Sequence, residues 1–182
     1  PVPSDAQASH VIGLGLADAM RHAVPDLPAE RVPEMVDRYR FHYLSGDQEL
    51  TLFEGIPQLL NDLQTAGHTL AVATGKSRLG LNRALQHSGL GPLFQSSRCA
   101  DECHSKPHPQ MLDELMSEFG VTPEVTLMIG DTSHDLLMAT NAGVDGLAVT
   151  YGAHTHEFLL EHKPLVCLHT VMELDLWLKK NA

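Results

Sequence analysis

The 182-residue sequence is short of basic residues, has few cysteines and contains no long apolar run. Twelve Lys and Arg against 23 Asp and Glu give a formal net charge of −11, which disfavours a nucleic-acid partner because a phosphate backbone would be repelled. Three cysteines do not make a disulfide framework, and they fit a reducing compartment. No apolar stretch approaches the ~18 residues of a membrane span, and no signal peptide is recognisable. We therefore expect a cytoplasmic protein with no membrane partner.

What the sequence does contain is enough apolar side chain for a core, 43% of all residues, arranged in two patterns. Residues 8–50 show helical spacing only, as in Ile12, Leu16, Met20 and Val24. From residue 51 onwards strands and helices alternate, which predicts an α/β fold with a parallel sheet. The expected strands are 69–74, 125–130, 146–150 and 165–169, and the expected helices are 55–66, 77–88, 107–119, 133–142, 156–162 and 170–179.

Two acidic residues, Asp131 and Asp135, follow the apolar run VTLMIG. A carboxylate at the end of a buried strand is suited to a hard cation such as Mg²⁺, which takes oxygen ligands. Asp135 lies one helical turn further on, on the same side of the chain. A simpler interpretation is that Thr132 and Asp135 form a capping box at the start of a helix. The pattern favours a metal ligand at Asp131 and leaves both interpretations open for Asp135.

Three further residues, Thr74, Gly75 and Lys106, also lie where we expect elements to end. A hydroxyl and free backbone N–H groups after the strand TLAVA are suited to hold phosphate oxygens, although Thr74-Gly75 could equally be a simple turn. Lys106 precedes Pro107, which we place at the first helical position. An ammonium held there could stabilise negative charge on a nucleophile and a phosphoryl group. The alternative is an ordinary exposed lysine.

In chain order these motifs are T-G after a strand, K-P before a helix, and G-D-x-x-x-D. The set resembles the haloacid dehalogenase-like phosphatases over essentially the whole chain, and within them the phosphoglycolate phosphatase-like group. VIGLGLADAM resembles the start of a small helical cap, and LFEGIPQLLNDLQTAGH resembles the return to the core. The resemblance implies a three-layer Rossmann-like parallel-sheet core over residues 51–182 and a small α-helical cap over residues 1–50. A remnant of the first core helix is allowed for at the start of the cap.

The resemblance also implies a role for each candidate residue. Thr74 and Gly75 would bind the phosphoryl group, and Lys106 would hold both that group and the nucleophile. Asp131 would be a ligand of Mg²⁺, and Asp135 would act in catalysis by orienting Lys106 and the metal loop. The implied function is a Mg²⁺-dependent phosphatase for a small phosphorylated metabolite similar to phosphoglycolate. We expect a monomer or a homodimer.

One part of the family pattern is missing. The first motif of these phosphatases, D-x-D-G-T, supplies the nucleophilic Asp and a second Asp that is the general acid and base, but the sequence contains no D-x-D. Asp47-Gln48-Glu49 comes nearest and is expected to be a linker between cap and core. We therefore expect the first strand, its motif loop and one helix to be absent, so that an aspartyl-phosphate would form on an Asp outside this chain. Without that central strand, two sheet edges and a groove would be exposed. The chain is then a fragment, an altered chain, or one whose gap another element fills.

Three alternative functions need weighing. A sugar-phosphate mutase of the same superfamily would use the same motifs, with the cap contacts deciding between them. A haloacid dehalogenase is disfavoured because those enzymes need no metal, and their fourth motif resembles S-N rather than Gly130-Asp131. A binding or regulatory module without activity is the alternative from a different class. Upstream sequence carrying a D-x-D-G-T would favour the enzyme.

Two other motifs are set aside. GLGLAD at residues 13–18 hints at a dinucleotide fingerprint, but no strand precedes it and the third glycine is absent. A zinc site is disfavoured because the spacing of the four candidate ligands matches no standard closed site. Those ligands would be Cys99, Cys103, His104 and His108.

Overall fold

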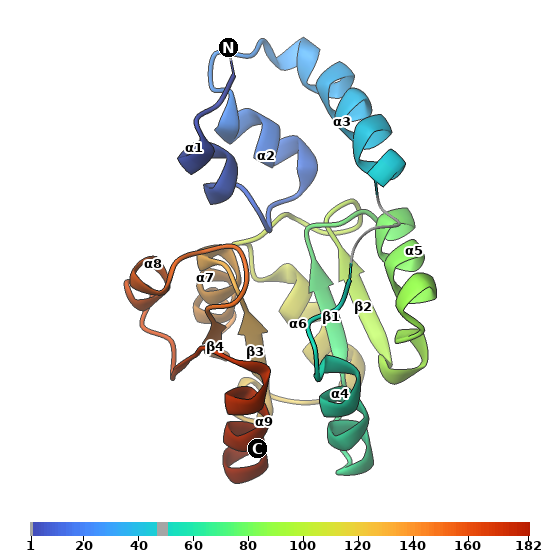
Figure 1. Ribbon diagram of the computed structural model, residues 1–182, viewed down its shortest axis with the longest axis vertical. Helices are drawn as coiled ribbons and strands as arrows, with labels where there is room; N and C mark the ends of the chain where they lie inside the picture. The colour runs from blue at the N-terminus through green and yellow to red at the C-terminus, as the bar shows by residue number, and fades with distance from the viewer. Residues whose placement is uncertain (1, 47–50) are drawn as a thin grey trace.

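The computed structural model describes residues 2–46 and 51–182. Asp47, Gln48 and Glu49, which the sequence predicts to be a linker, lie outside the described residues. The N-terminal part contains three α-helices in its described residues: α1 (Asp5–His10), α2 (Leu16–Ala23) and α3 (Val32–Gly46). A 3₁₀ turn over Ala29–Arg31 leads into α3. Figure 1 shows this group at one end of the molecule, beyond the carboxyl ends of the strands.

The N-terminal helices pack on one another through a small apolar cluster of Met20, Val32 and Val36. The predicted helical run from Ile12 to Val24 is wrong at its start. Ile12 lies in the turn between α1 and α2 and is 49% exposed. The turn contains Gly13, whose φ of 95° favours glycine and interrupts a helix.

The strands form two parallel sheets in the described residues. The first pairs β1 (Ala71–Thr74) with β2 (Ser96–Cys99), and the second has the order β3 (Leu127–Gly130), β4 (Asp145–Val149), β5 (Cys167–Leu168). The fold is α/β with parallel strands, as predicted. In the described residues β1 and β3 do not pair with each other, which leaves the two open edges expected of a sheet without its central strand.

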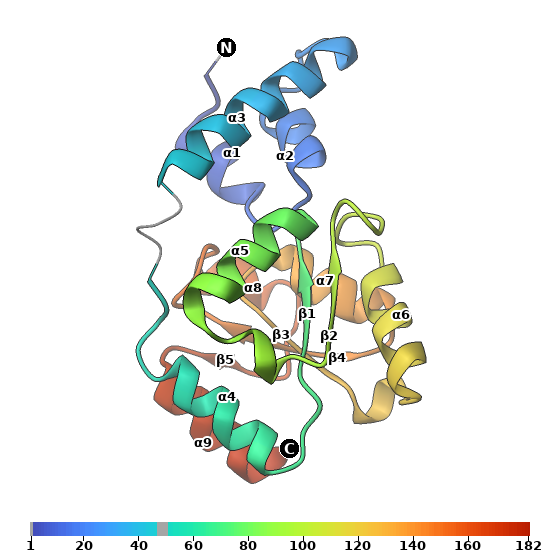
Figure 2. The same cartoon turned by 90° about the vertical axis from the view of Figure 1, so that its right-hand side faces the viewer.

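Helices cover both faces of the sheets, which gives the predicted three layers (Figures 1 and 2). One face carries α4 (Ile56–Thr65), α5 (Arg78–Ser88) and α9 (Val171–Asn181), and the other carries α6 (Gln110–Phe119) and α7 (Ser133–Asn141). A short helix, α8 (His156–Leu160), packs near α7. None of the helices in the described ranges is long and apolar enough to cross a membrane.

Two apolar clusters hold these layers together. The first joins α4 and α9 to the second sheet, through Leu59, Leu147, Val149, Leu168, Leu174 and Leu178. The second lies between α6 and α7 and is centred on the fully buried Met111 and Met138. Ala73 of β1 and Met128 of β3 both pack against this second cluster. The shared core therefore connects the two sheets although their strands do not pair.

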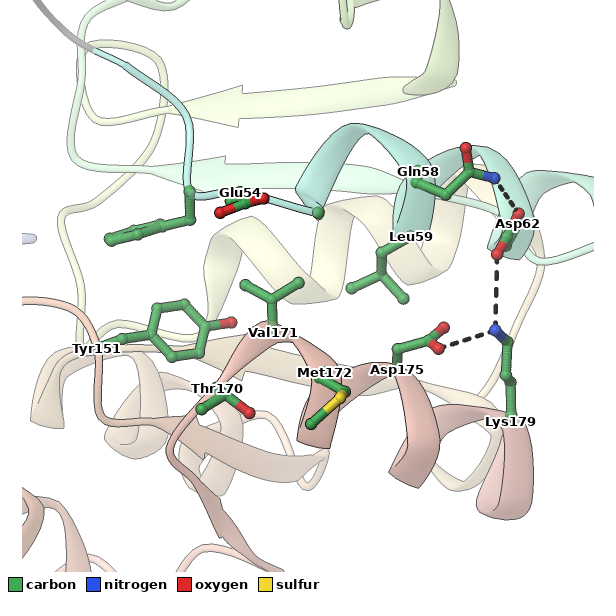
Figure 3. Close-up of a pocket in the computed structure, with 12 residues that line it drawn as sticks. Glu54, Gln58, Leu59, Asp62, Tyr151, Thr170, Val171, Met172, Asp175 and Lys179 are labelled. Atoms are coloured by element: carbon green, nitrogen blue, oxygen red, sulfur yellow. Dashed lines mark hydrogen bonds and ion pairs between the residues drawn. The ribbon is translucent and has the colours of Figure 1, made fainter.

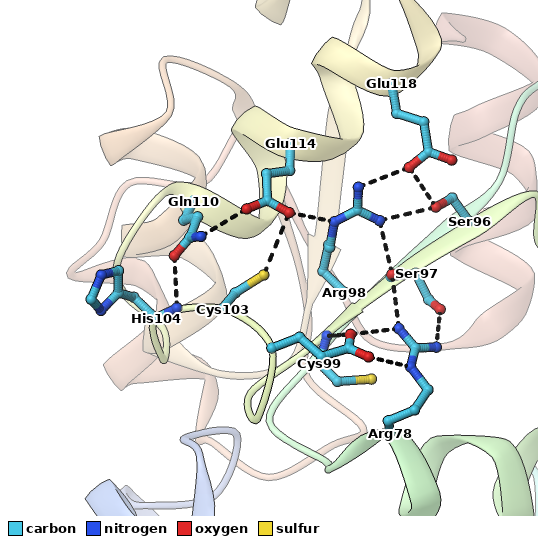
Figure 4. A network of polar contacts seen from close by, with 11 residues as sticks. Arg78, Ser96, Ser97, Arg98, Cys99, Cys103, His104, Gln110, Glu114 and Glu118 are labelled. Carbon is cyan, nitrogen blue, oxygen red and sulfur yellow. Dashed lines mark hydrogen bonds and ion pairs between the residues drawn. The ribbon is translucent and has the colours of Figure 1, made fainter.

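Strand β2 was not predicted, because S-S-R-C has no apolar alternation. Its side chains are instead held by charged groups (Figure 4). Arg98 binds Glu114 at 2.6 Å and Glu118 at 2.8 Å, and Arg78 of α5 donates to Ser97 Oγ at 2.6 Å. These contacts tie β2 to α6 and α5. Charged side chains therefore attach this strand to the neighbouring helices, whereas apolar contacts attach the other strands.

Most predicted elements are present with shorter bounds, and one boundary is wrong by three residues. Helix α6 begins at Gln110 with Pro109 at its N-cap, so Pro107 is not at the first helical position. Ser77 is the N-cap of α5, as predicted, and its hydroxyl accepts a hydrogen bond from the N–H of Gly80. Gly89 ends the same helix in the left-handed conformation.

Candidate functional site

The predicted site residues lie at the carboxyl ends of strands or in the loops that follow them. Thr74 ends β1, Asp131 follows the last residue of β3, and Asp135 lies in the first turn of α7. Lys106 lies in the loop between β2 and α6. Since the strands in each sheet are parallel, their carboxyl ends share one edge, where open α/β sheets bind ligands.

Lys106 and Asp135 form a buried ion pair. The Lys106 ammonium Nζ lies 2.5 Å from Asp135 Oδ1, and the two side chains are 6% and 5% exposed. The interpretation of Lys106 as an exposed lysine is therefore wrong. A buried ammonium needs a charged partner, because leaving either charge alone in the interior is costly. The pair fixes the position of the Lys106 ammonium at this edge of the molecule.

Asp135 also caps the helix on which it lies. Its Oδ2 accepts hydrogen bonds from the backbone N–H of Thr132 at 3.1 Å and from the Thr132 hydroxyl at 2.7 Å. Thr132 Oγ1 in turn accepts from the N–H of Asp135, which completes a capping box. The capping-box interpretation is confirmed, and the same carboxylate still binds Lys106. Gly130 packs directly against the Asp135 side chain, and no larger residue would fit there.

Asp131 is partly buried and held by the loop that follows β4. Its Oδ2 accepts from the N–H of Ala153 at 2.8 Å, and its carbonyl oxygen accepts from the N–H of His154 at 3.1 Å. The other carboxylate oxygen, Oδ1, accepts no hydrogen bond from the described residues. One free carboxylate oxygen fits Mg²⁺, which commonly takes one or two carboxylates and completes its shell with water and substrate phosphate. Among the described residues no cluster of three His, Cys, Asp or Glu could hold a metal by itself, so Asp131 fits as one ligand of a larger set.

Thr74 and Gly75 form a tight turn beside the N-terminal helices. Thr74 Oγ1 accepts from the N–H of Lys76 at 3.1 Å. A Cβ atom added to Gly75 would lie 2.5 Å from the carbonyl oxygens of both Gly13 and Leu14. The turn between α1 and α2 therefore lies directly on Gly75. No sequence signal predicted this contact, because the segments are some 60 positions apart.

Two buried histidines, His134 and His154, also lie near the site. His134 Nε2 donates to the carbonyl oxygen of His10 at 2.7 Å. His154 Nδ1 accepts from the N–H of Ser133 at 3.0 Å, and its Nε2 donates to the carbonyl oxygen of Ser9 at 3.3 Å. Burial lowers the pKa of both His134 and His154, so both rings favour the neutral form. Burial, and then the negative charge of Asp131, raises the pKa of the nearby Tyr151.

A cavity of about 600 Å³ lies elsewhere, between α4 and α9. Figure 3 shows Tyr151 near one end and an ion-paired group of Asp62, Lys179 and Asp175 at the other. The ring of Phe53 lies edge-on to Tyr151, with the ring centroids 5.0 Å apart. None of the predicted site residues lines this cavity. We therefore take the strand-end cluster, and not this cavity, as the candidate site.

Comparison with known proteins adds an independent observation. Residues 1–149 match the family described as haloacid dehalogenase-like hydrolase. A probable phosphatase, IndB, of Dickeya dadantii is 40% identical over 124 residues, which are 68% of this chain and 54% of the relative. The pyrophosphatase PpaX of Halalkalibacterium halodurans is 32% identical over 169 residues, which are 92% of this chain and 77% of the relative. The chain thus spans about half the length of the first relative and more of the second.

Solved structures agree on the fold. A crystal structure of a predicted phosphoglycolate phosphatase from Haemophilus somnus 129pt superimposes with a TM-score of 0.83 at 23% identity. The match covers 100% of this chain and 84% of that one. At this level of identity the likeness concerns the fold alone. It agrees with the Rossmann-like, three-layer arrangement described above.

Proposed function

Because the chain belongs to the haloacid dehalogenase-like hydrolase family, we propose that it forms the larger part of a Mg²⁺-dependent phosphatase. Its substrate would be a small phosphorylated metabolite similar to phosphoglycolate, handled in the cytoplasm by a monomer or homodimer. The observation that carries the proposal is the buried Lys106–Asp135 pair, which lies in the same loop region as Asp131. Phosphoryl transfer depends mainly on positioning and on charge stabilisation, and these three residues can supply both.

Each residue has one task in the proposed reaction. The Thr74 hydroxyl and the Gly75 N–H would donate hydrogen bonds to phosphoryl oxygens, and Lys106 would offset their negative charge. Asp135 would hold the Lys106 ammonium in place. Asp131 would bind Mg²⁺, which supplies further positive charge at the phosphoryl group when bound. No described side chain of this set is an activated nucleophile, because the ammonium of Lys106 is paired and Thr74 has no adjacent base.

The nucleophile would therefore come from an Asp outside these 182 residues. One of its carboxylate oxygens would bond to phosphorus as the ester P–O bond breaks and the alcohol leaves with a proton. Water would then release inorganic phosphate and restore the carboxylate. In the described part of the chain β1 and β3 each have one edge without a partner strand, and both pack on the core that includes Ala73 and Met128, which supports this proposal. A strand placed between them would end beside Thr74 and Asp131.

The test is Asp131→Asn in the protein together with its native upstream residues. Loss of the carboxylate charge should lower Mg²⁺-dependent turnover of an aryl phosphate by on the order of 100-fold, because each 1.36 kcal/mol of lost transition-state stabilisation costs tenfold. The matched control is Asp145→Asn. Asp145 is an exposed carboxylate at the opposite end of the β3–β4 pair, and its loss should leave the rate unchanged.

Assays with and without Mg²⁺ separate the outcomes. Unchanged rate and metal dependence in Asp131→Asn would show that the metal ligand lies elsewhere. Absence of phosphatase activity in the parent protein would favour a binding module. The name of the Halalkalibacterium relative makes pyrophosphate the second substrate to assay.

A further inference from the structure

We propose that Ser105 is a positioning residue that holds the turn of residues 13–15 against Gly75, so that this turn and a phosphoryl group compete for the same backbone. The proposal rests on the proposed function, because it takes Thr74 and Gly75 as the phosphate-binding residues. It assigns a role to the glycines of GLGLAD, which fit no dinucleotide site. It also assigns a role to a serine that no motif identified.

The first observation is how closely the turn approaches Gly75. The carbonyl oxygens of Gly13 and Leu14 each lie 2.5 Å from the position of an added Cβ on Gly75. Carbonyl oxygens carry partial negative charge, as phosphoryl oxygens do. An anion that approaches this side of Gly75 would be repelled by the partial negative charges of these two carbonyl oxygens, which also fill the space beside Gly75. The turn of residues 13–15, in its position on Gly75, therefore opposes phosphate binding by electrostatic repulsion and by steric exclusion.

The second observation is that the turn is fixed by contacts with two of the motif loops. The backbone N–H of Gly15 donates to Ser105 Oγ at 2.7 Å, and Ser105 immediately precedes Lys106. A Cβ on Gly15 would lie 3.0 Å from the Ala100 side chain. A Cβ on Gly13 would lie 3.0 Å from Thr132 Oγ1, beside Asp131. The turn thus fits between the Lys106 loop and the Asp131 loop only because its glycines have no side chains.

The helix before the turn has its own attachment. The rings of His134 and His154 donate to the carbonyl oxygens of His10 and Ser9, at the end of α1. These hydrogen bonds do not involve the turn or Ser105. Removal of the Ser105 hydroxyl should therefore release the turn while α1 stays attached to the core. Of the side chains on the motif loops, Ser105 is the one that bonds the turn directly through a hydrogen bond in the described residues.

The experiment measures binding of inorganic phosphate, with Mg²⁺ present, by titration calorimetry. It compares the full protein with its Ser105→Ala and Ser96→Ala variants. Ser96 is also a half-buried serine, and its hydroxyl donates to Glu118 at 2.8 Å and accepts from Arg98 at 3.2 Å, away from the turn. One lost hydrogen bond should ease displacement of the turn and make phosphate bind about fivefold more tightly to Ser105→Ala. Ser96→Ala should bind phosphate as the parent does.

A second readout follows the turn itself. Saturating phosphate should speed amide hydrogen exchange at residues 12–16 in the parent protein, because binding displaces the turn. Gly13→Ala should show fast exchange there without phosphate, since an alanine at φ of 95° is strained and crowds Thr132. Ser105→Thr keeps an acceptor and should restore the parent's phosphate affinity.

Each outcome has a distinct meaning. Equal phosphate affinity in the parent and Ser105→Ala, or slower exchange of the turn on phosphate binding, overturns the role of Ser105 and leaves the proposed function intact. Failure of phosphate to bind to any of the variants overturns both. Tighter binding in Ser105→Ala alone, with faster exchange at residues 12–16, supports the positioning role. If the effect of Ser105→Ala were merely structural, the melting temperature would fall by the same amount in Ser105→Ala and Ser96→Ala.

Discussion

The carboxylate of Asp135 accepts hydrogen bonds from one loop and binds the ammonium of another. Through Thr132 it fixes the start of α7, and through Lys106 it fixes the loop that precedes α6. A helix cap and a charge partner are usually considered separately, but here they are the same group. The stability of α7 and the placement of the Lys106 charge are therefore coupled, and a substitution at Asp135 would change both.

The buried ion pair gives a prediction at the residue scale. Lys106→Met leaves the Asp135 carboxylate buried without its cation, which should lower the free energy of unfolding by about 3–5 kcal/mol. Urea unfolding measures this change. The control is Lys179→Met, because Lys179 pairs with Asp62 and Asp175 while its side chain is 57% exposed. That variant should leave the free energy of unfolding nearly unchanged, since exposed ion pairs contribute little. Equal effects of the two substitutions would contradict the interpretation.

Local sequence gave part of the candidate site and not the rest. The motif residues were found because each follows a strand or precedes a helix, and the resemblance to a family supplied their roles, which remain a prediction. Ser105 and Gly13 were not found. Their contacts join segments about 90 and 120 positions apart, and no spacing rule reports such a contact. The burial of His134 and His154 was not predicted, because a buried histidine looks the same in sequence as an exposed one.

At the scale of elements, the predictions succeeded where apolar residues recur at regular spacing or where a residue suited to cap a helix was present. Helices α5 and α7 begin after Ser77 and Thr132, whose side chains accept hydrogen bonds from the first turn. Strand β2 was missed because its burial depends on Arg98 and its carboxylate partners in α6. The start of α6 was placed too early because a proline suits both the first turn of a helix and the loop before it.

Two of the N-cap threonines, Thr132 and Thr155, allow a test at this scale. Thr132→Ala should lower the free energy of unfolding by about 2 kcal/mol, at the upper end for a cap, because Thr132 is only 1% exposed and its hydroxyl also binds Asp135. Thr155→Ala removes the cap of α8, where the hydroxyl accepts from Phe158 in an exposed position. We expect a loss of about 0.5 kcal/mol there. Thermal and urea unfolding give both values, and a larger loss at Thr155 would refute the ranking.

At the scale of the whole molecule, the described strands form two sheets because β1 and β3 do not pair. The missing D-x-D motif anticipates this division, because the resemblance places the strand that carries the motif in the middle of the sheet. The sequence could predict the strands and the gap between them, but not how the chain holds the two sheets together. Helices α6 and α7 hold the two sheets together through their shared apolar cluster.

A strand supplied between β1 and β3 should change the molecule measurably. We expect the protein with its native upstream residues to show slower amide hydrogen exchange at Val72, Ala73, Met128 and Ile129 than residues 1–182 alone, because a ladder protects backbone N–H groups. Only the longer protein should hydrolyse an aryl phosphate with Mg²⁺. Exchange in β4, which already has neighbours on both sides, serves as the internal control. Comparable turnover by the shorter protein would mean that the nucleophile has been misassigned.

The edges of β1 and β3 also bear on how these 182 residues behave on their own. Arg98 and its acidic partners place charged side chains on the outer strand β2, which disfavours pairing with another strand. The strands Ala71–Thr74 and Leu127–Gly130 contain no charged residue. Uncharged, unpaired edges are templates for intermolecular pairing and aggregation. The net charge of −11 keeps molecules apart at low ionic strength, and salt would screen that repulsion. Solubility of the isolated chain would thus depend on long-range charge repulsion. A strand between β1 and β3 would instead pair with both edges and remove the sites of aggregation.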